Sequence, residues 1–597
     1  MPQTEHETIQ CCDSCSSVVA AKCTIPLSDV SATKEHCQIC SLLFRTVKSL
    51  CNDDELDIRI VRDRSILRAG TMGPRILRVC ADSEHSTDSS NHRDDIPIGF
   101  SNLPKAGSPT YFELLRTWLR WCDESHIDKS HSCNKRDAKT KPALPSRLLW
   151  VGNPDDQDYD PNFLRLDIST DESEGRYVAL SHCWGKLPTE VKKHFCTTPE
   201  NISRRKGGFS VWELPKTFQD AVKVTRELRV PYLWIDSLCI IQFEVREEDW
   251  QREVRRMEEV FSGAYCTIAA TSASNSYTGF LERSVRSEYV HVQAASGKFY
   301  ISGDIDDFEN DVENAPLSQR AWVMQERVLS PRTIHFTANQ TYWECGEGVY
   351  CENFSRLKSP FRKRFFILDP NFPTRLLRSG YQRTTEFIHF LYEDYSKRGL
   401  TEKTDRCVAI SGLETRIAGG LQCKSRYGIF EKYFHRNLLW QASDSKMAEI
   451  DYKPGHVPSW SWMAYNGGIQ FMDDIPFGEV AWARNLRFDK EREHALVADV
   501  GKFQDELKLD EEHAVLDSSN EKRGSIRYDV RGEDEETRDL CEARCVVVGM
   551  KAEEGAKTYY ILVVKPTKEM EGDYRRVGVG SIQSPYVVRQ LANVRVV

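Results

Sequence analysis

The chain has 597 residues, which is more than one hydrophobic core usually serves, so we expect two or three domains. A hydrophobic fraction of 40% excludes global disorder, and a net charge of -9 argues against a protein that binds nucleic acid through a basic face. No apolar run approaches the roughly 20 residues of a membrane-spanning helix, and the polar start lacks the features of a signal peptide. We therefore expect a cytoplasmic protein whose 20 cysteines are mostly reduced thiols or metal ligands.

Residues 1–80 are expected to form a cysteine-rich N-terminal segment. Cys12 and Cys15 make one Cys-x-x-Cys pair, and Cys37 and Cys40 make a second. The separation of the two pairs is near that of four-cysteine zinc sites, so one interpretation is a structural zinc ion. In the alternative interpretation, the second pair lies on the buried side of a helix, because free cysteine behaves as a small hydrophobic residue.

Residues 81–175 are expected to be a linker followed by a helical entry module. Polar, turn-rich stretches at 81–95 and 123–141 indicate loops. Between them, Tyr111–Trp121 has the apolar spacing of a helix.

Residues 176–345 alternate strand and helix signals, which favours an α/β domain with a parallel sheet flanked by helices. Apolar spacing predicts helices after Pro215 and after the acidic run Glu247–Asp249. The predicted strands are Tyr177–Leu180, Tyr232–Asp236, Thr267–Ala270 and Thr333–Thr337.

Two of these strands end abruptly in polar and aromatic residues. The motifs are Tyr177–Gly185 (YVALSHCWG) and Leu233–Gln242 (LWIDSLCIIQ). Parallel strands end at one edge of a sheet, where open α/β sheets build their ligand sites. The candidate binding residues at this edge are Ser181, His182, Trp184 and Asp236.

A third motif, Arg320–Arg327 (RAWVMQER), places a tryptophan and a glutamate four residues apart. Residues at this spacing lie on one face of a helix. Trp322 would thereby hold its flat ring beside the carboxylate of Glu326.

Together the three motifs resemble the fungal heterokaryon incompatibility (HET) domain over about residues 177–343. The resemblance implies a TIR/flavodoxin-like fold and a role in fungal non-self recognition and programmed cell death, a form of innate immunity. The third motif is similar to the helix with which TIR enzymes cleave NAD at its nicotinamide–ribose bond. By that resemblance Glu326 is the catalytic residue, and Trp322 joins the substrate-binding set. Val323 stands where TIR enzymes have a cysteine.

The glutamates also have structural interpretations. Glu326 lies between Arg320 and Arg327, so an ion-paired structural role is the alternative. Glu253, three residues after Trp250, is the runner-up carboxylate, although its place on an amphipathic helix favours an ion pair.

Three functional hypotheses stay open. The first is an NAD glycohydrolase that takes NAD or a related nucleotide and requires no cofactor. The second is a non-catalytic signalling scaffold that forms a homo-oligomer or recruits an incompatibility partner protein. The third is a cysteine-dependent hydrolase, with Cys183 or Cys239 as nucleophile and His182 or His335 as base.

Beyond the third motif, residues 346–440 are expected to be helical and residues 441–597 β-rich. Ala543–Met550 and Tyr559–Val564 have strand-like sequences. Alternation in Pro458–Trp462 predicts a strand with both tryptophans on one face. The charged stretch Asp517–Arg538 is predicted to be a mobile insertion.

Overall fold

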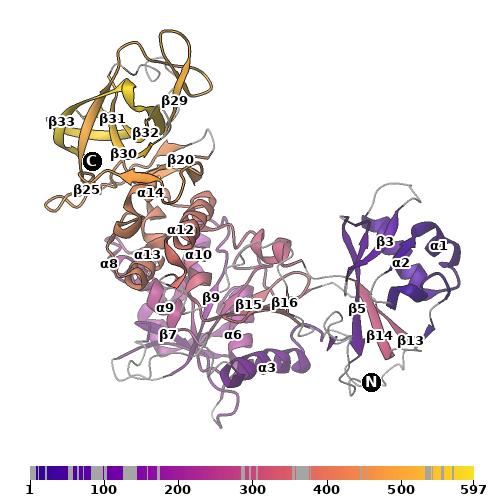
Figure 1. Ribbon diagram of the computed structural model, residues 1–597. Helices are drawn as coiled ribbons and strands as arrows, with labels where there is room; N and C mark the ends of the chain where they lie inside the picture. Colours follow the sequence, from indigo (N-terminus) through magenta and orange to yellow (C-terminus); the bar gives the residue numbers. More distant parts are fainter. Residues whose placement is uncertain are drawn as a thin grey trace. The chain divides into compact units, whose positions relative to one another are not determined.

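The structure is a computed structural model that describes residues 9–10, 12–19, 23–50, 58–63, 66–71, 73–82, 98–99, 104–125, 144–157, 159–170, 175–283, 289–294, 297–303, 307–352, 356–357, 376, 378–443, 447–453, 455–530, 540, 542–552, 557–567 and 570–597 (Figure 1). The chain divides into two compact units. The first comprises Met1–Glu253, Glu259–Ser318 and Leu329–Pro370, and the second comprises Val254–Glu258, Gln319–Val328 and Asn371–Val597. No helix among the described residues is long and apolar enough to cross a membrane.

In the described part of the first unit, nine strands form one mixed sheet in the order β10-β8-β7-β11-β9-β12-β15-β16-β17. The four strands β11, β9, β12 and β15 run parallel to one another, and β7 and β16 pair antiparallel with the outer two of them. The strands are β7 (Arg147–Trp150), β8 (Phe163–Ile168), β9 (Tyr177–Ser181), β10 (Phe209–Ser210), β11 (Tyr232–Trp234), β12 (Cys266–Ala269), β15 (Arg332–Phe336), β16 (Thr341–Cys345) and β17 (Gly348–Cys351).

The predicted strands lie within one sheet and run parallel to one another, but the sheet as a whole is mixed, because β7 and β16 flank them in antiparallel pairs. Tyr232 lies beside Tyr177 in the parallel register of β11 and β9. At one side of this group only residues 337–340 connect β15 to β16. Such a short turn permits an antiparallel pair, because a parallel crossover needs a dozen or more residues.

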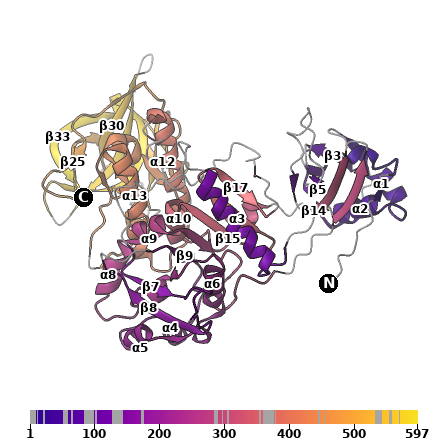
Figure 2. The ribbon, with the colours of Figure 1, turned by 90° about the horizontal axis from the view of Figure 1, so that it is seen from below.

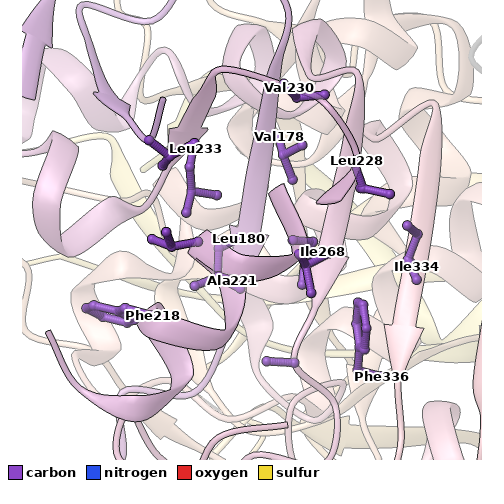
Figure 3. Packing of buried hydrophobic residues seen from close by; sticks show 14 of the residues in the cluster. Val178, Leu180, Phe218, Ala221, Leu228, Val230, Leu233, Ile268, Ile334 and Phe336 are labelled. Carbon is purple, nitrogen blue, oxygen red and sulfur yellow. The ribbon is translucent and has the colours of Figure 1, made fainter. Parts of the chain in front are cut away.

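Helices supply the apolar side chains that pack with this sheet. Helix α6 (Lys216–Glu227) begins directly after Pro215, as predicted, and contributes Phe218 and Ala221 to a cluster with Val178 and Ile268 (Figure 3). Helix α3 (Pro109–Ser125), predicted within Tyr111–Trp121, packs against β16 (Figure 2). There the rings of Trp118 and Trp343 stack at 6.1 Å, and the Tyr111 and Thr341 hydroxyls are 2.6 Å apart.

A second sheet of the first unit joins the N-terminal segment to a hairpin from far along the chain. Eight of the described strands form it: β1 (Ile9–Gln10), β13 (Tyr289–Ala294), β14 (Gly297–Gly303), β5 (Arg75–Asp82), β4 (Ile66–Ala69), β3 (Arg59–Asp63), β2 (Thr24–Pro26) and β6 (Ile98–Gly99). Helices α1 (Leu27–Thr33) and α2 (Gln38–Leu50) share a small apolar cluster with it. The hairpin β13–β14 lies between β12 and β15 in sequence, so the N-terminal sheet incorporates a piece of the predicted HET region.

The second unit combines helices with a β-rich C-terminal part, as the sequence predicts. The α-helices among its described residues include α10 (Ala321–Leu329), α12 (Gly380–Lys397), α13 (Val408–Leu421) and α14 (Phe434–Leu438). Among the described strands, five close a ring by pairing in the order β30-β26-β33-β32-β31-β30. These are β26 (Leu496–Phe503), β30 (Arg544–Ala552), β31 (Lys557–Pro566), β32 (Asp573–Gln583) and β33 (Val587–Val596).

Two C-terminal predictions fail in detail. Trp460 and Trp462 are fully buried, but they lie in a turn and a 3₁₀ helix, because the Ser461 side chain accepts a hydrogen bond from the Met463 backbone N–H at 3.0 Å. The predicted mobile insertion contains a paired strand, β29 (Lys522–Tyr528), whereas its residues 531–539 lie outside the described part of the chain.

Candidate functional site

The polar residues that follow β9 and β11 meet at the edge where both strands end. Ser181 is the last residue of β9, and its carbonyl oxygen accepts a hydrogen bond from the backbone of Ala270, just after β12. Asp236 begins the short helix α7 (Asp236–Cys239), two residues after the last residue of β11. The carboxyl ends of three adjacent parallel strands therefore carry these loops. We call Ser181, His182, Trp184 and Asp236 the rim.

A hydrogen bond between side chains connects the two strand-end motifs. The Trp184 indole Nε1 donates to Asp236 Oδ2 at 2.8 Å, and the Ser237 backbone N–H donates to Asp236 Oδ1 at 2.6 Å. A carboxylate offers about four lone-pair positions, so two donors leave acceptor capacity. The Asp236 side chain is 30% exposed, so this capacity is accessible to a ligand hydroxyl or N–H.

His182 lies behind the rim, because its side chain is only 1% exposed. Its Nδ1 is 4.0 Å from Asp236 Oδ1, and its ring runs nearly parallel to that of Trp184, at 15° and 6.5 Å. The ring of Phe218 in α6 also contacts the His182 ring edge-on, with ring centres 5.0 Å apart. His182 therefore supports the rim from the core and does not face solvent.

Trp184 of the rim has a buried aromatic neighbour, Phe195, and a cation, Lys192, beside it. Phe195 meets Trp184 edge-on at 6.4 Å and Tyr277 at 6.1 Å, and Tyr277 is 47% exposed. Lys192 Nζ lies 5.9 Å from the centre of a Trp184 ring. A flat ring beside a lysine and a carboxylate suits a ligand that has both a planar group and negative charge.

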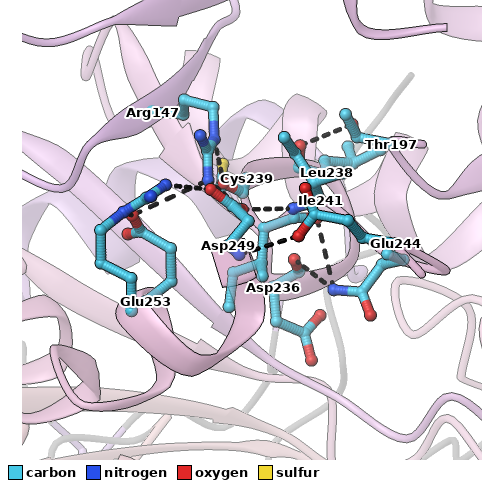
Figure 4. Close-up of polar contacts among 12 residues, drawn as sticks. Arg147, Thr197, Asp236, Leu238, Cys239, Ile241, Glu244, Asp249 and Glu253 are labelled. Atoms are coloured by element: carbon cyan, nitrogen blue, oxygen red, sulfur yellow. Dashed lines mark hydrogen bonds and ion pairs between the residues drawn. The ribbon is translucent and has the colours of Figure 1, made fainter. Parts of the chain in front are cut away.

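The loop after β11 is held in place by a buried ion pair (Figure 4). Arg147 Nη2 contacts Asp249 Oδ2 at 2.5 Å, and Arg147 Nε donates to the carbonyl oxygen of Cys239 at 2.6 Å. The same Asp249 oxygen accepts from the Ile241 backbone N–H at 2.8 Å. Thr197 holds the other side of the loop through its hydroxyl, which donates to the Leu238 carbonyl oxygen at 2.6 Å. These four bonds fix the backbone that carries Asp236.

Sequence reasoning missed these positioning residues. Asp249 was assigned only to a helix N-terminus, and Arg147 only to the entry module. In the sequence nothing separates Asp249 from Glu247 and Glu248, and only the structure shows that Asp249 is buried and therefore needs a partner.

Gly185 is required where the loop after β9 meets the loop after β12. Its φ is +81°, and a Cβ at this position would lie 2.3 Å from the Cβ of Asn275. Asp220 of α6 steadies the second loop, because its Oδ2 accepts the backbone N–H of Phe280 at 2.9 Å and of Leu281 at 3.3 Å. The close packing of the two loops sets the position of Trp184.

Two thiols near the rim, Cys239 and Cys196, are poor nucleophiles. Burial raises the pKa of Cys239 to about 12, so this thiol keeps its proton at neutral pH. Burial, together with the negative charge of Asp236, also raises the pKa of Cys196 to about 12. His335 is buried, and its Nε2 lies 2.8 Å from Glu344 Oε2. Cys239 is therefore unsuited to the cysteine-dependent hydrolase, which needs an ionised thiolate.

The two candidate glutamates have different surroundings. Glu253 is 5% exposed, and its carboxylate lies 3.1 Å from Arg252 Nε and 3.8 Å from Arg147 Nη2, beside the ion pair of the loop. Glu326 is 8% exposed on α10, in the second unit, whereas the rim belongs to the first. In that second unit the Trp322 indole Nε1 donates to Asp405 Oδ2 at 3.1 Å.

Residues 177–326 match the family model described as heterokaryon incompatibility protein (HET). This match bears out the resemblance to the HET domain, and we call residues 177–326 the HET segment. It runs from the first residue of β9 to Glu326 and so contains the rim, the loop after β11 and the hairpin β13–β14. No curated protein and no solved structure matches the chain. The family match indicates a heterokaryon incompatibility-type function.

Proposed function

We propose that this protein acts in fungal non-self recognition and programmed cell death by cleaving NAD at its nicotinamide–ribose bond, with the rim as part of the substrate site. The observation that carries the proposal is the hydrogen bond between Trp184 and Asp236 at the carboxyl edge of the parallel strands. Their spatial order β11-β9-β12-β15 is 2-1-3-4 in chain order. Flavodoxin-like sheets begin in this order and bind ligands where it reverses, beside their first strand. Ser181 ends that strand here.

The proposed chemistry needs few groups. The bond between ribose C1′ and the nicotinamide nitrogen breaks, nicotinamide leaves as a neutral molecule with both bonding electrons, and water adds hydroxide to C1′ and releases a proton. Asp236 would accept ribose hydroxyls, the Trp184 ring would stack on a planar group, and Lys192 would face a phosphate. By the TIR resemblance, Glu326 supplies the negative charge that stabilises the oxocarbenium ion.

We further propose that cleavage requires assembly of the protein into an oligomer by its trigger. Glu326 is 8% exposed in the single chain, so a substrate has little access to it in this state. A change that uncovers the helix around Trp322 and Glu326 would couple recognition of a partner to NAD turnover.

The test measures NAD consumption by concentrated wild-type protein and by Glu326→Gln, which keeps the shape of the side chain and removes its charge. We expect the variant to lose at least about 100-fold in rate, since one electrostatic contact to a transition state contributes about that much. Glu248→Gln is the control, because Glu248 is 69% exposed and lies outside the proposed site. Intact NAD with assembled wild type, or equal turnover by Glu326→Gln, would overturn the proposal.

A specific observation favours a non-catalytic scaffold as the second candidate. Exposed apolar side chains stand on the loops after β11 and β12, where Phe243 is 42%, Val245 99% and Tyr277 47% exposed. In that case Phe243→Ser combined with Val245→Ser abolishes self-association and cell death, while Glu326→Gln remains fully toxic in cells. The enzyme hypothesis predicts the opposite for Glu326→Gln.

A further inference from the structure

Four cysteine sulfurs converge in the N-terminal part of the first unit. The Sγ atoms of Cys12, Cys15, Cys37 and Cys40 all lie within 4.8 Å of one another. Three pairs of these sulfurs are in contact: Cys12 and Cys15 are 3.5 Å apart, Cys12 and Cys40 are 3.5 Å apart, and Cys15 and Cys37 are 3.6 Å apart. Two chain segments, 22 or more residues apart, thus bring four thiols to one point.

Local structure aims each pair of thiols. Cys12 lies at the start of a turn, in which its carbonyl oxygen accepts the backbone N–H of Cys15 at 3.2 Å and of Ser16 at 2.9 Å. Cys37 immediately precedes α2, and Cys40 lies in the first turn of that helix. A tight turn facing the start of a helix, each with a Cys-x-x-Cys pair, is a common way to build a four-cysteine metal site.

We propose that Cys12, Cys15, Cys37 and Cys40 bind one zinc ion. Four sulfurs placed tetrahedrally at about 2.3 Å from zinc lie about 3.8 Å from one another, close to the distances of 3.5 and 3.6 Å found here. Disulfides would require sulfur separations of about 2.05 Å. Four thiolate ligands in tetrahedral arrangement select zinc or iron over harder cations, and zinc is the usual choice for a structural site.

Hydrophobic packing alone does not account for this cluster. The apolar stripe of α2 contains Leu43 and Val47, which are fully buried and pack with the sheet. Cys23 lies in the same part of the unit, yet its sulfur is not among the four that converge. Cysteines that served only as small hydrophobic residues would have no reason to gather their sulfurs at a single point.

The zinc ion would also fix the edge of the sheet that receives the HET hairpin. Strand β1 ends two residues before Cys12 and pairs in parallel with β13, which lies within the HET segment. Binding of the turn at Cys12 to α2 therefore anchors the strand next to this hairpin. We infer that the metal stabilises the association of the N-terminal segment with the HET segment.

The first experiment is metal analysis of the full-length protein purified without chelator. We expect about one zinc per chain for the wild type and for the control Cys23→Ser, and less than about a tenth of that for Cys37→Ser combined with Cys40→Ser. Less than a tenth of an equivalent of zinc in the folded wild type, or an undiminished content in the double variant, would overturn the proposal. Stoichiometric iron in place of zinc would overturn the identity of the metal.

A second measurement works on the wild type alone and so does not depend on the folding of a variant. Thiol alkylation followed by mass mapping should leave the four cysteines protected until a strong chelator is added, while Cys23 reacts equally with and without chelator. Protection that persists under chelation, or that ends only with a reductant, would show burial or disulfides and sink the zinc site. Both measurements are independent of NAD turnover, so they fail or succeed apart from the proposed function.

Discussion

Each unit contains a tryptophan-to-aspartate hydrogen bond, and the two bonds have similar lengths and different surroundings. Trp184 donates to Asp236 at 2.8 Å, and Trp322 donates to Asp405 at 3.1 Å. The first pair connects loops at the ends of parallel strands, where backbone N–H groups and exposed aromatic rings gather. The second connects helix α10 to the 3₁₀ helix Lys403–Arg406, which is followed along the chain by α13. A motif tryptophan is therefore no proof of a ligand site, and what lies around the bond decides its role.

The same contrast holds for buried charges. In the first unit, the pair of Arg147 and Asp249 holds a loop that carries a rim residue. In the second unit, Arg576 and Asp529 form a pair inside the core, where both side chains are at most 2% exposed. If the polar contacts of the second unit are structural, their removal should change stability more than any change at the rim does.

The largest expected effect is therefore that of Arg576→Met. Its guanidinium makes two bonds of 3.0 Å to Asp529 and donates to the carbonyl oxygens of Leu438 and Trp440. The substitution leaves a buried carboxylate unpaired, so we expect the free energy of unfolding in urea to fall by about 3–5 kcal/mol. Arg575→Met is the matched control, because its side chain is 45% exposed and its surface pair contributes about 0–1 kcal/mol. Equal losses for both variants would contradict the structural role of the buried pair.

Part of the arrangement of the rim was predictable from sequence, because it depends only on where neighbouring strands end. Neighbouring parallel strands end at the same edge, so strand ends in two adjacent motifs were enough to place Trp184 near Asp236. Arg147 could not be assigned, because its partners Cys239 and Asp249 lie 92 and 102 residues away and no periodic pattern reports such contacts. The addition of hairpin β13–β14 to the N-terminal sheet was missed for the same reason. The spacing of the four cysteines carries a signal for their convergence, which is one of the two interpretations that the sequence allows for that segment.

The second prediction uses pH to test whether His389 is buried and neutral in the folded second unit. His389 of α12 stacks on Phe471, with ring centres 3.8 Å apart, and burial lowers its pKa from 6.5 to about 3, with the charge of Arg436 adding to the effect. His389 is thus protonated below about pH 6.5 in the unfolded chain, whereas in the folded chain it stays neutral until the pH is near 3. Stability from this group is complete above pH 6.5 and is lost as the pH falls.

We therefore expect His389→Phe to remove a pH dependence of up to about 1.4 kcal/mol per unit between pH 6.5 and pH 4.5. The measurement is the free energy of unfolding of both proteins at several pH values, with pH 7.5 as the reference at which the two curves are aligned. Parallel curves across this range would mean that His389 has the same pKa in the folded and the unfolded protein.

The third prediction concerns the tryptophan of the second unit. Trp322→Phe removes the indole N–H donor and leaves the partly buried Asp405 carboxylate without that bond, so we expect a loss of about 1 kcal/mol in the free energy of unfolding. Asp405→Asn keeps an acceptor oxygen for the indole and should cost less. A stabilising effect of Trp322→Phe would contradict the structural role given to this bond.

The smallest effect on stability is expected at the rim. A substitution there should instead weaken the binding of NAD. Trp184→Phe also removes an indole donor, but Asp236 keeps the Ser237 N–H and is 30% exposed, so water can take the vacated position and the loss should stay below about 0.5 kcal/mol. If Trp184 stacks on a planar group of NAD, the variant should bind NAD or ADP-ribose about tenfold more weakly by calorimetry, because stacking of a base on an aromatic side chain is worth about 1–3 kcal/mol. Trp322→Phe, matched in chemistry, should bind as the wild type does if its bond is only structural. Equal weakening by both substitutions would place Trp322 in the substrate site, and unchanged binding by Trp184→Phe would remove the rim from it.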